Sequence, residues 1–120
     1  LLDRRKIDVI GLSVQDSRDA TVARLILSDP DAAEELLMEQ GIAFTLSELV
    51  VIRMLESGEG LKKCLMTLYE AETNLDYAFS LMTQHQGRSL LALHLEDLEF
   101  GASMLNQAGF TVVYENELLR

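Results

Sequence analysis

One helix-punctuating pattern occurs twice in this chain, and its two occurrences are 68 positions apart. Asp29 precedes a helix-forming run that Gly41 follows, and Asp97 precedes a second run that Gly109 follows. An aspartate accepts hydrogen bonds from the free N–H groups of a first helical turn. A glycine takes the left-handed conformation beyond the last turn at little cost. The shared spacing predicts an internal repeat.

The repeat extends well beyond the two helices. At the same offset, residues 8–44 align with residues 76–112 without a gap. The identities fall at positions where the structure restricts the residue type, namely the helix cap, the helix terminator and the predicted strand face. The identical pairs are Asp8/Asp76, Leu25/Leu93, Leu27/Leu95, Asp29/Asp97, Leu37/Leu105 and Gly41/Gly109. The chain is therefore predicted to contain two copies of one structural unit.

The second copy is predicted to be complete. Alternating and β-branched runs predict its strands, and apolar residues at helical spacing predict its helices. The order β-α-β-β-α-β predicts an α+β fold, the ferredoxin-like split βαβ arrangement with a four-stranded antiparallel sheet and two helices on one face. The predicted strands are 50–55, 74–83, 88–96 and 110–116, and the predicted helices are 59–73 and 98–108.

The first copy is predicted to be incomplete in this chain. Strands are expected at 8–15 and 20–28, a helix at 30–40, and nearly continuous extended chain over 42–55. Counterparts of residues 51–68 would fall ahead of Leu1, so the opening strand of this copy is expected to be disordered, cleaved or unrecorded. The predicted domains are residues 1–48 and 49–120.

Composition excludes several classes of function. A net charge of −10 gives no positive field for phosphate backbones or anionic lipid surfaces, so direct nucleic-acid and membrane binding are not expected. No apolar run reaches the roughly 18 residues that span a bilayer. The start of the chain does not read as a signal peptide. With a single cysteine, the chain is expected to be cytoplasmic.

These features resemble the ACT domain family, over essentially the whole chain. The likeness rests on two ferredoxin-like copies in tandem, on Asn74-Leu75-Asp76-Tyr77 entering the second strand of its copy, and on capped helices that end in glycine. It is strongest to small stand-alone bacterial proteins with two ACT domains. The resemblance implies a regulatory module that is not an enzyme. It also implies an amino-acid ligand, bound where the first strand turns into the first helix and against the second strand of a neighbouring domain.

The resemblance also implies which residues bind the ligand. Free N–H groups at a helix N-terminus suit a carboxylate, and glycine allows close approach of the backbone. Gly58 stands where the family usually has proline, and Glu59 stands where it usually has glycine. A glutamate there would repel a carboxylate, so the alternative is an oligomerising interaction scaffold whose ligand pocket is lost. The implied ligand-binding residues are Glu56, Ser57, Gly58, Glu59, Gly60, Leu61, Asn74, Leu75 and Asp76.

The residues predict neither a catalytic nor a metal site, and no cofactor is expected. Cys64 falls on the apolar stripe of its predicted helix and is expected to be buried. His85 and His94 lie in a turn and in a strand, which is not a metal-ligand pattern. Both faces of the predicted strands are partly apolar, so the face without helices is expected to form an interface, and a homodimer is predicted.

Overall fold

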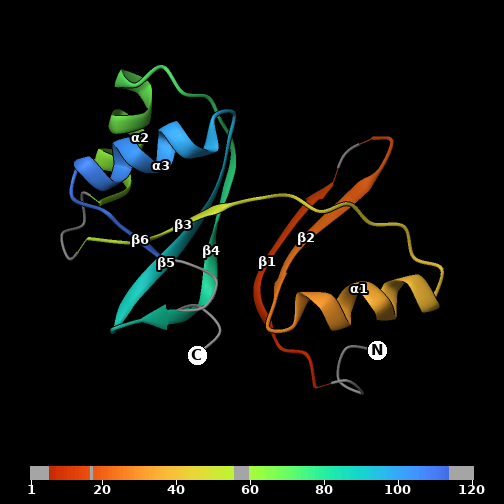
Figure 1. The fold of residues 1–120 in the computed structure, drawn as a ribbon. Helices are drawn as coiled ribbons and strands as arrows, with labels where there is room; N and C mark the ends of the chain where they lie inside the picture. Colours follow the sequence, from red (N-terminus) through yellow and green to blue (C-terminus); the bar gives the residue numbers. More distant parts are fainter. Residues whose placement is uncertain (1–5, 17, 56–59, 114–120) are drawn as a thin grey trace. The chain divides into compact units, whose positions relative to one another are not determined.

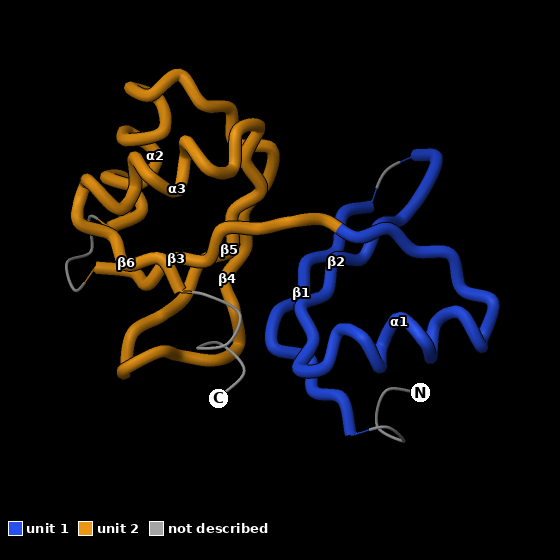
Figure 2. The backbone as a smooth tube through the Cα atoms, viewed as in Figure 1, with its two compact units in different colours: residues 1–46 blue, residues 47–120 orange. Residues whose placement is uncertain are grey.

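The computed structural model describes residues 6–16, 18–55 and 60–113. The chain divides into two compact units, residues 1–46 (unit 1) and residues 47–120 (unit 2), as Figure 2 shows. The fold is mixed α+β, and the described residues form six strands and three helices (Figure 1). None of these helices is long and apolar enough to cross a membrane.

Unit 1 is a β-hairpin followed by a helix. Strands β1 (Val9–Asp16) and β2 (Thr21–Leu27) pair antiparallel, with Leu12 opposite Leu25. Helix α1 (Pro30–Glu39) follows, with proline in its first turn, where the missing N–H is not needed. Among the described residues of this unit, the buried apolar side chains are those of Ile7, Ala33 and Leu36.

Unit 2 has the predicted element order. Its strands pair antiparallel in the spatial order β4-β5-β3-β6. Helices α2 and α3 cover the same face of these strands (Figure 1). The elements are β3 (Val50–Arg53), α2 (Gly60–Glu70), β4 (Leu75–His85), β5 (Arg88–Leu95), α3 (Leu98–Gln107) and β6 (Thr111–Val113).

The core of unit 2 lies between the helices and the sheet. Alternate residues of β5 point toward the helices, because successive strand residues face opposite sides of a sheet. Leu93 and Leu105 are completely buried there, as is Cys64 from α2. The full cluster comprises Val50, Ile52, Cys64, Leu68, Leu91, Leu93, Leu95, Leu105 and Phe110.

The two predicted helix caps are confirmed, with closely matching geometry. The Asp29 carboxylate accepts a hydrogen bond from the backbone N–H of Ala32 at 3.1 Å, and Asp97 accepts one from Phe100 at 3.1 Å. Beyond the helices, Gly41 and Gly109 both have positive φ, 69° and 101°. The repeat is thus expressed in local structure as well as in sequence.

Three boundaries differ from the sequence prediction. Residues 42–49 were expected to be extended and belong to no strand, and β3 begins at Val50 as predicted but ends at Arg53 rather than at residue 55. Helix α2 ends at Glu70 because Glu72 adopts a positive φ of 55°, which ends a helix without the usual glycine. The turn expected at 84–87 is the tighter pair Gln86–Gly87, both with positive φ, which suits the twist of a two-residue hairpin. The predicted strand end at 114–116 lies outside the described residues.

Candidate functional site

The first part of the predicted ligand site, residues 56–61, falls between β3 and α2 and at the start of α2. Four of its residues, Glu56, Ser57, Gly58 and Glu59, lie outside the described residues. Gly60 is the first residue of α2 and is buried. A Cβ atom at Gly60 would lie 3.3 Å from Met54 Cε and 3.4 Å from the Leu55 backbone nitrogen. Glycine therefore allows the start of α2 to lie close against the chain that leaves β3. Leu61, the next residue, is half exposed.

The start of β4 carries the second part. Asn74 donates a hydrogen bond from Nδ2 to Glu96 Oε2 at 2.6 Å, which joins this segment to the end of β5. Leu75 is partly buried and packs against the core cluster. The Asp76 carboxylate lies 2.8 Å from His94 Nδ1. Residues 74–76 are thus held in place by the packing of Leu75 and by the polar contacts of Asn74 and Asp76.

The structure does not bring these two parts together within unit 2. Gly60 and Leu61 begin α2, whereas Asn74 follows the end of the same helix by four residues. A helix of 11 residues is about 16 Å long, far more than the length of an amino acid. Gly60 and Asn74 therefore cannot contact the same small ligand within unit 2.

Asp76 and His94 belong to a small cluster that the sequence did not predict. The rings of Tyr77 and His94 stack with centroids 4.8 Å apart and planes 9° apart. The rings of Tyr77 and Phe79 also stack, with centroids 6.3 Å apart. The strand pairing is irregular between Leu75 and Tyr77, which lets two successive residues, Asp76 and Tyr77, both reach His94. Strand alternation in the sequence gives no sign of such an irregularity.

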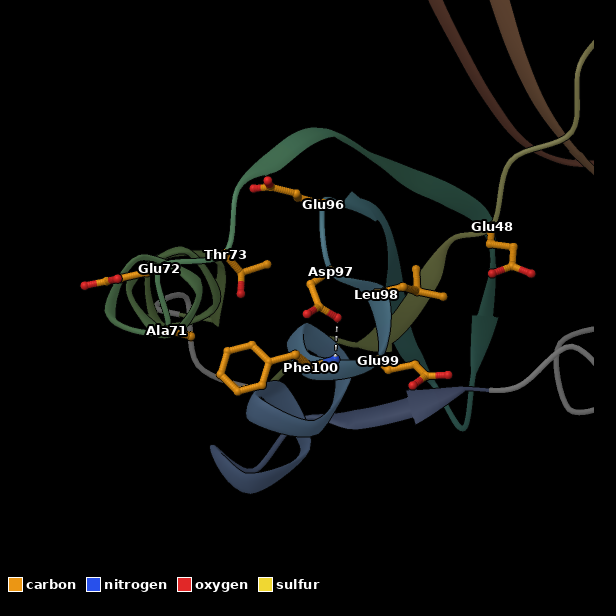
Figure 3. A pocket seen from close by; sticks show the side chains of 9 residues that line it. All are labelled: Glu48, Ala71, Glu72, Thr73, Glu96, Asp97, Leu98, Glu99 and Phe100. Atoms are coloured by element: carbon orange, nitrogen blue, oxygen red, sulfur yellow. Dashed lines mark hydrogen bonds between the residues drawn. The ribbon is translucent and has the colours of Figure 1, made fainter.

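A second unpredicted feature is an acidic hollow at the N-terminal end of α3, shown in Figure 3. One of its carboxylates, that of Asp97, is already used to cap the helix. The negative charge of the acidic side chains that line the hollow opposes binding of an anionic group. Within the described parts of the chain, no group of three or more acidic, His or Cys side chains is placed to hold a metal ion. The hollow is lined by Glu48, Ala71, Glu72, Thr73, Glu96, Asp97, Leu98, Glu99 and Phe100.

Cys64 has the environment of a structural residue. Its side chain is completely buried in the core of unit 2. Burial raises the pKa of the Cys64 thiol to about 11. The thiolate is the reactive form of cysteine, so this environment opposes nucleophilic chemistry at neutral pH.

Comparisons with known proteins point to one family. A family model described as "ACT domain pair" matches residues 1–118. The chain is also similar to the crystal structure of protein BT0572 from Bacteroides thetaiotaomicron, with a TM-score of 0.87 and 19% sequence identity. That match covers 99% of this chain and 81% of the Bacteroides chain. The search of curated proteins gave no match.

Proposed function

This chain belongs to the ACT domain pair family, and on that premise we propose that it is a non-enzymatic regulatory module that binds a small ligand such as an amino acid. ACT domains are regulatory modules rather than catalytic ones. In this proposal the chain holds two ferredoxin-like ACT copies, residues 1–48 and 49–120. It acts in the cytoplasm and neither binds nucleic acid directly nor associates with membranes.

The observation that supports this proposal most is the separation of the two predicted site segments. Gly60 and Leu61 lie at one end of α2, and Asn74, Leu75 and Asp76 lie beyond its other end. A ligand that contacts both kinds of segment must sit between two domains. Binding there would link ligand occupancy to domain assembly, because a ligand stabilises the arrangement to which it binds more tightly.

Each segment has chemistry suited to an amino acid. The start of α2 supplies free backbone N–H groups for a carboxylate, and Gly60 lets the start of this helix lie close to Leu55. The start of β4 supplies the Asp76 carboxylate, which can accept hydrogen bonds from an ammonium group. The counterpart of Asp76 in the first copy is Asp8, so both copies carry an acid at this position.

The second candidate function is an oligomerising scaffold without a ligand. Glu59 favours it, because a carboxylate at the start of the helix would occupy the place of the ligand carboxylate and repel it. Under this alternative the repeat is kept for assembly. Both readings include a homodimer formed through apolar strand residues.

A thermal-shift screen against the twenty amino acids separates the two candidates. For the regulatory module, one amino acid at about 100 times its Kd should stabilise the fold by roughly 2.7 kcal/mol. Flat responses to all twenty would contradict ligand binding by the unmodified chain. A response that appears only in Glu59→Gly, and not in the control Glu48→Gly, would identify the Glu59 side chain as the block and support the scaffold.

A further inference from the structure

The Asp76 carboxylate, one of the groups proposed to bind the ligand, has a histidine as its close neighbour. The Nδ1 atom of His94 lies 2.8 Å from Asp76 Oδ2. An ionised carboxylate only accepts hydrogen bonds, so Nδ1 is the ring nitrogen that carries a hydrogen and donates it. The side chains of His94 and Asp76 are 31% and 49% exposed, so both groups can be reached by a ligand and by protons from the solvent.

An aromatic ring holds the imidazole of His94 in this position. Tyr77 pairs directly with His94 across β4 and β5. The two rings stack, with centroids 4.8 Å apart and planes 9° apart. His94 therefore keeps one face against Tyr77 and its Nδ1 edge toward Asp76. A change in the charge of this imidazole acts on the Asp76 carboxylate at short range.

Other charged groups on the neighbouring elements of unit 2 lie farther from His94. The Glu96 carboxylate, just beyond β5, accepts a side-chain hydrogen bond at 2.6 Å, and Glu48, ahead of β3, lines the hollow at the start of α3. Arg53 of β3 pairs with a residue four positions from His94 along β5, a distance of about 13 Å. Arg88, at the start of β5, is farther still. Helices α2 and α3 pack on the opposite face of β5, because His94 alternates with core residues.

The first copy of the repeat has the same acid without the histidine. Asp8 corresponds to Asp76, whereas the counterpart of His94 is Ile26 and the counterpart of Tyr77 is Val9. Neither isoleucine nor valine titrates. The two copies therefore differ at this position: one carboxylate lies beside a titratable ring, and the sequence of the other copy supplies no such ring.

We propose that His94 is a positioning residue that makes ligand binding at Asp76 sensitive to pH, an inference that rests on the proposed function. Neutral His94 donates to Asp76 and orients the carboxylate, whose negative charge attracts the ammonium group of an amino acid. When Nε2 takes up a proton, the imidazolium pairs with Asp76 and repels that ammonium group. The affinity of this copy for its ligand therefore falls as the pH falls through the range in which histidine titrates, about pH 8 to 5. Binding at the first copy, beside Asp8, lacks this dependence.

Titration of the chain with amino acids at two pH values tests this inference. Each of the twenty amino acids is added singly at about pH 7.5 and at about pH 5.5, on either side of the usual pKa of histidine. The Kd is measured from the NMR shifts of the Leu75 and Asp76 amides. We expect binding to be roughly fivefold to tenfold weaker at the lower pH, because the neutral fraction of an ordinary histidine falls about tenfold over this range. Shifts of the Ile7 and Asp8 amides, the equivalent positions of the first copy, should show no such difference.

Two variants assign the pH dependence to its source. His94→Asn retains an amide donor for Asp76 but does not titrate, so its Kd should be the same at both pH values. His85→Asn is the matched control, because it removes the other histidine of the chain, and it should keep the dependence of the parent. If His94→Asn does not fold, as judged by circular dichroism, His94→Gln takes its place, since glutamine also carries an amide donor that does not titrate.

The outcomes separate this inference from the proposed function. Saturable binding with the same Kd at both pH values in the parent chain would overturn the inference and leave the proposed function standing. A pH dependence that persists in His94→Asn would belong to another group and would also overturn the inference. The absence of saturable shifts with any of the twenty amino acids at either pH would contradict the proposed function, and the inference with it.

Discussion

The matched leucines of the repeat provide the sharpest stability prediction. Complete burial of a leucine side chain stabilises a fold by about 1.5–3 kcal/mol, and the cavity left by truncation brings the usual cost of Leu→Ala to about 2–5 kcal/mol. Leu93 is 0% exposed, so we expect Leu93→Ala to cost unit 2 an amount in that range. Leu25 is 44% exposed, and water can fill the space that its truncation leaves. We therefore expect Leu25→Ala to cost unit 1 only about 1 kcal/mol.

The assay must follow the two units separately, because unfolding of a two-unit chain need not be a single transition. Urea titration observed residue by residue in two-dimensional NMR spectra gives a free energy of unfolding for each unit. All three tyrosines lie beyond residue 46, so tyrosine emission gives an independent midpoint for unit 2. Equal costs for the two truncations would refute the reasoning, since they would mean that Leu25 is fully buried in solution.

Three further predictions concern packing, titration and assembly. Gly101→Ala should destabilise unit 2 by about 1–3 kcal/mol in urea titrations, because the added Cβ would collide with the buried Leu95 side chain. The better helix propensity of alanine does not offset this collision. Unchanged stability of unit 2 would contradict the prediction. The pKa of the Cys64 thiol rises from 9.0 to about 11 on burial, so the folded state holds its proton and loses stability as the pH rises from 9 to about 11. Melting temperatures of Cys64→Ala should lack this part of the alkaline decline, and identical pH profiles would refute it. Ile26→Lys combined with Met82→Lys should weaken the proposed homodimer in sedimentation while the circular dichroism spectrum stays the same, whereas a monomeric parent chain at tens of micromolar would contradict the dimer.

Features set by local chemistry were predictable from the sequence. The caps at Asp29 and Asp97 and the terminators at Gly41 and Gly109 depend on a few neighbouring residues, and the structure shows them where the spacing placed them. The element order of unit 2 was also predictable, because its apolar periodicity changes clearly between strand and helix.

Features that depend on distant partners were not predictable. Residues 42–49 are as apolar as a strand, yet a strand also needs a neighbour with which to pair, and composition does not report whether one is present. The contact of Asp76 with His94 depends on an irregular register between β4 and β5. For the proposed ligand site, the sequence predicted two segments, whereas their separation by the length of α2 follows only from the structure.

The central claim, that an ACT domain pair binds a small ligand with the start of α2 and the start of β4, is tested most directly by NMR titration with amino acids. We expect one amino acid to shift the amide resonances of Gly60 and Leu61 and those of Asn74, Leu75 and Asp76 in a saturable manner with a single Kd. Shifts at both segments with the same Kd would show that one binding event involves both. The absence of saturable shifts with any of the twenty amino acids, or shifts confined to other parts of the chain, would contradict the claim.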